Sequence, residues 1–249
     1  GEAGDYFQAF APPFRPEAQE FDPVNAWWLG EIAGLVYRRG SAEASGAGAR
    51  PSRARVLATV GLEEAAAIYV RGLACAVVRP REGARPYAVA VFRGVTGLRT
   101  WAYALDARPV RAPRGGVHRG FHRALGLLWP RLQPWLKSIP GPWFFTGHSM
   151  GGALALLAAA RHPPRAVYTF GAPRVGDAAF MARLAPLAHH HLVTPCDPVP
   201  HLTPLTAGRA FAPLQPGLRF CRQGHLHPPA EDRTAPGQSA ALDLWRLIP

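Results

Sequence analysis

A serine flanked by glycines is the part of this chain whose residue types and spacing best suit nucleophilic chemistry. The segment Gly147-His148-Ser149-Met150-Gly151-Gly152 follows an apolar run over 143–146 and precedes a helical pattern over 153–160. Gly-x-Ser-x-Gly between a strand and a helix is the context of a nucleophile elbow, and it favours this interpretation over an ordinary Gly/Ser turn. The glycines admit a strained, closely packed turn. We therefore expect an exposed serine hydroxyl, with the Met150 N–H directed at a developing oxyanion.

An activated serine also needs a base and a carboxylate that orients the base. Asp197 follows a predicted strand over 190–194, at the strand end where open α/β sheets gather their sites. The alternative is that Asp197 is a turn residue before Pro198. Asp177 is the rival carboxylate, but it begins a helical pattern, which favours an N-cap role.

The elements that must position these residues follow from length and patterning. The chain has 249 residues, 48% of them hydrophobic, which predicts one α/β domain over 1–249. Apolar patterns predict strands over 72–79, 87–92, 143–146, 166–170, 190–194 and 218–222, and helices over 23–39, 120–138 (interrupted near Pro130 and Pro134), 153–160 and 177–187. Residues 40–55 lack periodicity and predict a mobile surface loop. This alternation predicts a mainly parallel central sheet with helices on both faces.

Composition narrows the classes of partner. The net charge is +12, and Lys137 is the one lysine among 28 basic residues. The excess suits anionic surfaces, but the scatter of the arginines favours a compositional bias, and nucleic-acid binding is not expected. Neither an apolar run of about 20 residues nor a signal-peptide pattern occurs, so we expect no transmembrane segment or signal peptide in this chain. The three cysteines, Cys75, Cys196 and Cys221, permit at most one disulfide.

Five segments together carry a family resemblance. They cover 91–94, 117–121, 146–152, 170–177 and 193–202, and include Val-Phe-Arg-Gly, Val-His-Arg-Gly-Phe and Phe-Gly-Ala-Pro-Arg-Val-Gly-Asp. In content, order and spacing they resemble the fungal-type triacylglycerol lipases, the class 3 lipase family of the α/β-hydrolases. The resemblance implies an α/β-hydrolase fold and hydrolysis of carboxylic esters, most of all acylglycerols, through an acyl-enzyme. It implies Ser149 as nucleophile, Asp197 as triad carboxylate, and no metal or cofactor.

The same resemblance implies an oxyanion loop and a lid. The second oxyanion donor would come from the loop over 93–96, where similar lipases carry a serine or threonine and this chain has Val95. The Val95 N–H can still donate, and Thr96 would compensate if the loop shifts; losing one donor costs about 3 kcal/mol in the transition state. Residues 96–110 correspond to the lid. Its apolar residues either open at a lipid surface or pack in the core; they are Leu98, Trp101, Tyr103 and Leu105.

The triad histidine is ambiguous. In the family the base follows the aspartate by roughly fifty residues, whereas no histidine follows His227 here. Three hypotheses compete: the base lay beyond Pro249 in a longer chain, His225 or His227 serves as base, or the position was lost, for example to Gln238. The remaining histidines have structural interpretations, namely His118 in a hydrogen bond, His148 beside the nucleophile, His201 on the site wall and the run 189–191 on alternating strand faces.

These observations leave alternatives for function. The first is a lipase or esterase acting on a lipid or ester substrate, with transient contact with lipid surfaces. The second is a catalytically impaired lipid-binding protein of the same fold. The third keeps the enzyme and changes the substrate to a phospholipid or a short soluble ester. Compartment and oligomeric state are left open.

Overall fold

The computed structural model describes residues 6–7, 12–38, 51–81, 86–112, 115–193, 211–212, 214, 218–220 and 226–227, the last two stretches as backbone. The helices are α1 (Pro23–Leu35), α2 (Arg53–Ala58), α3 (Leu98–Leu105), α4 (Arg119–Ser138), α5 (Met150–Ala159) and α6 (Ala178–Leu184). The strands are β1 (Leu62–Val70), β2 (Leu73–Pro80), β3 (Ala88–Phe92), β4 (Pro109–Ala112), β5 (Gly115–His118), β6 (Trp143–His148), β7 (Ala166–Phe170), β8 (His189–Val193), β9 (Leu218–Phe220) and β10 (Leu226–His227).

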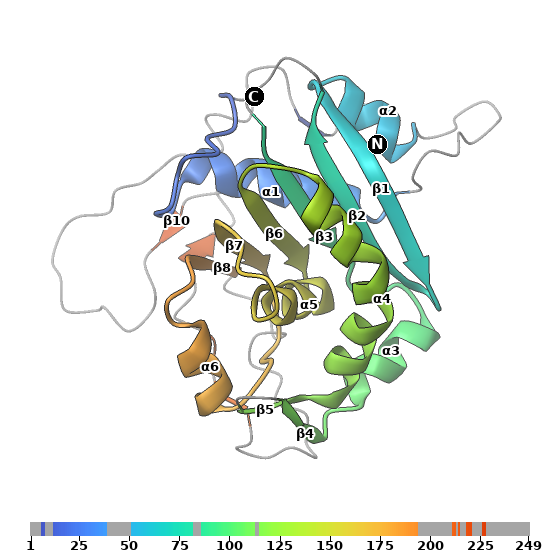
Figure 1. The fold of residues 1–249 in the computed structure, drawn as a ribbon, viewed down its shortest axis with the longest axis vertical. Coiled ribbons are helices and arrows are strands. Elements are labelled where there is room, and N and C mark those ends of the chain that lie inside the picture. The colour runs from blue at the N-terminus through green and yellow to red at the C-terminus, as the bar shows by residue number, and fades with distance from the viewer. Residues whose placement is uncertain are drawn as a thin grey trace, which may run out of the picture.

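A single large sheet organises the molecule, with strand order β1-β2-β3-β6-β7-β8-β9-β10 (Figure 1). In this sheet β3, β6, β7, β8 and β9 run parallel. Strands β1, β2 and β10 pair antiparallel with their neighbours. The expected α/β-hydrolase architecture, a mainly parallel sheet, is confirmed. Parallel strands end at one edge, so the ends of β3, β6, β7 and β8 gather their loops at the same place.

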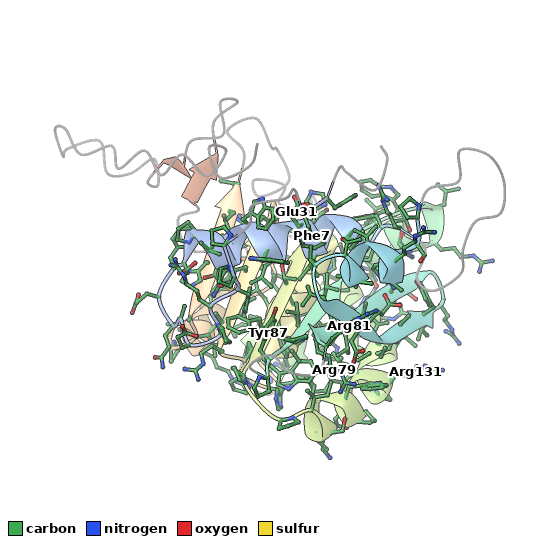
Figure 2. The ribbon with its side chains drawn as sticks, turned by 90° about the horizontal axis from the view of Figure 1, so that it is seen from above. Phe7, Glu31, Arg79, Arg81, Tyr87 and Arg131 are labelled. Carbon is green, nitrogen blue, oxygen red and sulfur yellow. The ribbon has the colours of Figure 1, made fainter. Side chains whose placement is uncertain are left out.

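Helices cover both faces of this sheet, as predicted. Helix α1 packs on one face, against β3, β6 and β7, and α4 and α5 cover the other (Figure 1). Asp22 caps α1 by accepting the N–H groups of Val24 and Asn25. The same helix holds the described N-terminal piece, because Phe7 N–H donates to Glu31 Oε2 at 3.1 Å (Figure 2).

Helix α5 is the centre of the core. All ten of its residues are buried, as expected for a helix that is apolar all round. It packs against β3, β6, β7 and α4. Its first turn is therefore held from several sides, and this turn carries Met150, Gly151 and Gly152.

The predicted interruption of the helix over 120–138 is wrong. Helix α4 runs unbroken through Pro130 and Pro134. Both prolines are exposed, as is Gly126 one turn earlier, so the backbone bonds that proline removes lie on the solvent side, where water can replace them. The opposite face secures the helix by burying leucines at 125, 128, 132 and 136.

Two elements near residue 60 escaped the sequence patterns. Residues 40–50 of the predicted loop lie outside the described residues, and its last residues, from Arg53, form the start of α2. Ser52 caps this helix by accepting Arg55 N–H at 3.3 Å. Arg53 is buried and ion-paired with Glu64. Near its start strand β1 holds glutamates and alanines, which are depleted in strands, and it pairs along β2.

The segment predicted as a lid holds helix α3 and strand β4, which pairs with β5 in a separate two-stranded sheet. It lies at the bottom of Figure 1, beside the start of α4. Among the helices of the described ranges, none is long and apolar enough to cross a membrane. Cys75 is buried and free, whereas Cys196 and Cys221 lie outside the described residues.

Candidate active site

Ser149 stands in the sharp turn between β6 and α5. Its backbone has φ 56° and ψ −129°, a conformation that costs a non-glycine residue about 1–3 kcal/mol and that clusters at functional sites. Its N–H donates to Phe170 O at 2.9 Å, which ties the turn to the end of β7. The side chain is partly exposed, so the structure presents the hydroxyl as the elbow motif predicts.

The glycines of the motif permit this turn by close backbone approach. A Cβ on Gly147 would lie 2.8 Å from Gly152 N, and one on Gly152 would lie 2.7 Å from Ala172 Cβ. A Cβ on Gly151 would overlap Phe92 O and lie 2.8 Å from Phe92 C. Because these distances exclude a side chain, glycine is required at all three positions.

The loop after β3 packs directly on the elbow. A Cβ on Gly94 would lie 2.7 Å from His148 O and 3.4 Å from Ser149 Cβ. Arg93 anchors the loop by donating from Nη2 to Gly72 O at 2.8 Å. The loop predicted to supply an oxyanion donor is thus brought to Ser149, with Val95 half-buried against the core.

The backbone N–H of Thr96 is hydrogen-bonded to Thr100 of α3. The Thr96 N–H donates to Thr100 Oγ1 at 3.0 Å, and Gly97 N–H donates to the same oxygen at 3.2 Å. Thr100 Oγ1 in turn donates to Gly97 O at 2.8 Å. The amide of Thr96 is therefore engaged at the start of α3, which leaves Val95 as the candidate for the second oxyanion donor.

Tyr37 joins the site from a part of the chain that sequence reasoning left aside. Its hydroxyl accepts Gly94 N–H at 3.1 Å and lies 3.1 Å from His148 Nδ1. Burial raises the pKa of this hydroxyl. One oxygen therefore links the oxyanion loop to the elbow. The available signal, an aromatic residue near the end of the predicted helix over 23–39, is too weak to have identified it.

The structure does not describe the side chains of the predicted triad partners of Ser149. Asp197, His225 and His201 lie outside them, and His227 is described only as backbone, paired with Arg219. What the structure places is the strand before Asp197. Gly171 N–H donates to Leu192 O at 2.8 Å, so β8 ends at the same sheet edge as the elbow.

The rival carboxylate, Asp177, has a structural role, and so has Asp106 in the segment predicted as a lid. Asp177 caps α6 by accepting Phe180 N–H at 2.8 Å and also accepts Gly116 N–H at 2.6 Å, which confirms the predicted N-cap. Asp106 ends α3 and pairs with Arg119 at 2.5 Å. Hydrogen bonding by Arg119 lowers the pKa of Asp106.

His118 is buried and fastens α3 to α4. Its Nδ1 accepts Phe121 N–H at 3.3 Å, which leaves Nε2 protonated to donate to Ala104 O at 3.2 Å. Desolvation by burial lowers its pKa to about 4. The predicted structural hydrogen bond is confirmed, and it supports the segment next to the site.

The histidine run of β8 alternates faces as predicted. Thr169 Oγ1 lies 2.9 Å from both His189 Nε2 and His191 Nδ1. His190 points to the opposite face, against Phe21 and Tyr168. Burial lowers the pKa of His189 to about 3, so His189 is neutral where it meets Thr169 within the sheet.

Acid is expected to weaken the fold through His118. The unfolded imidazole takes up a proton near pH 6.5 and the folded one only near its pKa of about 4. The free energy of unfolding therefore falls as pH drops through this window, by up to about 3 kcal/mol. His118→Asn keeps a capping acceptor and should flatten the decline, measured by urea unfolding at several pH values. His189 is present in both proteins, so its contribution cancels in the comparison. If the free energy of unfolding fell equally with pH in both proteins, His118 would not be the group responsible.

Comparison with known proteins agrees with this geometry. Residues 89–207 match the model of the family described as Lipase (class 3). The lipase of Rhizomucor miehei is 35% identical over 137 residues, covering 47% of this chain and 38% of that protein. A secreted mono- and diacylglycerol lipase of Fusarium solani is 32% identical over 145 residues, covering 51% of this chain and 42% of that protein.

A solved structure extends the match to the fold. That of the Rhizomucor miehei triacylglyceride lipase is 28% identical, with a TM-score of 0.54, and covers 67% of this chain and 68% of that chain. The alignments span about two fifths of the length of the two curated relatives. The matched segment contains the loop over 93–96, the elbow and the end of β8. On this agreement of sequence, fold and elbow geometry, residues 89–207 match the class 3 lipase family, and the chain has the fold of the α/β-hydrolases.

Proposed function

We propose that this chain is a serine hydrolase that releases fatty acids from acylglycerol esters through an acyl-enzyme. The observation that carries the proposal is the strained, partly exposed Ser149 at the N-terminus of α5, with the Gly94 loop packed on it. A serine held at the positive end of a helix, next to a loop of backbone N–H groups, has the surroundings that acyl transfer requires. Two of the relatives are named as lipases of mono- and diacylglycerols and of triacylglycerides, which agrees with this substrate class.

The mechanism follows from the placement of these groups. Ser149 Oγ attacks the ester carbonyl carbon while a histidine takes its proton, and the Met150 and Val95 N–H groups hold the oxyanion. The histidine then protonates the departing alcohol, which leaves an acyl-Ser149 ester. Water, deprotonated by the same histidine, attacks this ester and frees the fatty acid. Asp197 orients the histidine, for which His225, His227 or a residue beyond Pro249 remain the candidates.

Labelling with an organophosphonate ester probe tests the proposal. Phosphonylation requires an activated serine, so we expect one equivalent of probe on folded protein, mapped to Ser149 by mass spectrometry, and none after denaturation. No labelling of the folded chain would overturn the enzyme and favour a lipid-binding protein. The variants His225→Gln and His227→Gln then identify the base, because the correct one loses labelling.

The substrate is tested by comparing micellar acylglycerol, phospholipid and monomeric short-chain esters. A lid predicts a rise in rate when the ester passes its micellar transition. Preference for monomeric esters would show that the enzyme is a short-chain esterase and not a lipase. Preference for phospholipid would show that it is a phospholipase.

Loss of the Tyr37 hydroxyl is expected to slow the chemical step. In Tyr37→Phe the Gly94 N–H loses its acceptor, so the oxyanion loop is less firmly placed; kcat should fall roughly tenfold with little change in KM. Tyr168→Phe is a matched control, because Tyr168 OH also accepts one backbone N–H at 3.1 Å, from Asp22, away from the elbow. Equal losses of kcat in the two variants would show that Tyr37 acts only through stability.

A further inference from the structure

Helix α3 exposes large apolar side chains on one face. Leu98, Trp101 and Leu105 have exposed fractions of 90%, 52% and 71%, and their i, i+3, i+7 spacing places them in one stripe. Of the four residues expected to form an apolar lid face, Tyr103 differs, because it packs against the core. Such a stripe is costly in water unless it meets an apolar environment.

The inner face of α3 is firmly attached. Thr100 is buried, and His118 Nε2 donates to Ala104 O. A Cβ on Gly120 would lie 2.7 Å from Tyr103 C, so α4 begins in direct contact with α3. In this structure the helix therefore presents its apolar stripe outward from a fixed base.

Exposed arginines lie on α3 and on the segments next to it. Arg99 is exposed on α3 itself, and Arg108 and Arg111 are exposed in the segment that follows it. Arg71 is exposed in the turn between β1 and β2, and the next residue, Gly72, abuts α3, since a Cβ there would lie 3.9 Å from Arg99 Cβ.

The carboxylates described at this end of the molecule are already engaged. Asp106 pairs with Arg119 at 2.5 Å and with Arg123 at 3.5 Å, and Asp177 accepts two backbone N–H groups. Arg71, Arg99, Arg108 and Arg111 form no ion pair with any other described residue. The net field over this part of the surface is therefore positive.

We propose that Leu98, Trp101 and Leu105, framed by Arg71, Arg99, Arg108 and Arg111, form a docking surface for anionic lipid bilayers. The apolar stripe enters the boundary between head groups and acyl chains, and the arginines meet the lipid phosphates and anionic head groups. The inference rests on the proposed lipase function in placing the substrate at that surface. Beyond that function, the inference specifies that the lipid surface from which this chain takes its substrate is negatively charged.

Vesicle cosedimentation tests the docking surface without hydrolysis. Ser149→Ala protein is mixed with phosphatidylcholine vesicles, with or without phosphatidylglycerol. We expect strong binding only to the anionic vesicles. Adding Arg99→Gln, Arg108→Gln and Arg111→Gln should weaken this binding roughly 100-fold, because each arginine near an anionic surface contributes about a fivefold gain.

A matched control variant removes three positive charges from another part of the surface. Arg81, Arg131 and Lys137 are exposed; Arg81 follows β2 where β3 begins, and the other two lie in the later turns of α4. Figure 2 labels Arg81 and Arg131 in the view from the end opposite α3. Changing these three residues to glutamine should leave vesicle binding within about twofold. Equal weakening by both triple variants would reduce the effect to net charge and overturn the surface.

Two further outcomes would also overturn the proposal. One is equal binding to neutral and anionic vesicles, and the other is unchanged binding after Leu98→Gln, a substitution that the fold tolerates because this side chain is 90% exposed. These outcomes are independent of catalysis. Failure of the phosphonate probe would remove the proposed function and leave the vesicle result standing.

Discussion

Ser149→Ala is expected to abolish ester hydrolysis, lowering kcat by at least about 10⁴-fold. The nucleophile and its base act as a unit, so removing the hydroxyl leaves only the contribution of oxyanion stabilisation and binding. Hydrolysis of an acylglycerol or nitrophenyl ester, with probe labelling in parallel, measures the loss. Ser138→Ala, at the exposed end of α4, is the control and should retain full activity.

Stability separates a catalytic role for Ser149 from a structural one. Alanine carries a Cβ, so at φ 56° it keeps the strain of serine, and the free energy of unfolding should change little. Ser149→Gly removes the Cβ and should raise that free energy by about 1 kcal/mol while remaining inactive. Activity near the wild-type level in either variant would exclude Ser149 as the nucleophile.

Gly151→Ala is expected to be the most destabilising of the small substitutions near the site, by roughly 3 kcal/mol. The new Cβ would overlap the carbonyl of Phe92, which belongs to the backbone and cannot rotate away. Either α5 or the end of β3 must move, and because β3 leads into the Gly94 loop, activity should fall as well. Urea unfolding and esterase assays on the same samples measure both effects.

Gly126→Ala provides the matched control for that variant. A Cβ at Gly126 meets nothing within 4 Å, and the residue lies within α4, so alanine should raise the free energy of unfolding by about 0.5–1 kcal/mol. If Gly151→Ala unfolded at the same urea concentration as wild type, the close approach of α5 to β3 would be wrong.

Local patterns in the sequence determined the elements around the serine. A continuous apolar run, a Gly-x-Ser-x-Gly turn and an alanine- and leucine-rich helix predicted β6, the elbow and α5. Asp177 was recognisable as a cap from its place before a helical pattern. These features depend on backbone sterics and hydrogen bonds within a few residues, so adjacent residue types suffice to reveal them.

Other features depended on contacts between distant parts of the chain. The Tyr37 hydroxyl meets Gly94 and His148 only after α1 has packed on the sheet. Helix α4 tolerates its two prolines because one face is buried against the core and the other is solvated. Strand β1 forms because β2 offers it an edge. None of these outcomes is readable from local propensity, because long-range packing overrides it.

The sequence by itself determined that a serine would be presented in a strained turn between a buried strand and a buried helix, since the residues that build the turn are neighbours in the chain. Only the tertiary structure decided what surrounds that serine: that the Gly94 loop packs on it, that the Thr96 amide is engaged with Thr100, and which side of α3 faces solvent. The physical reason is that these contacts join segments up to 111 residues apart, and their geometry is set by how the sheet and helices pack.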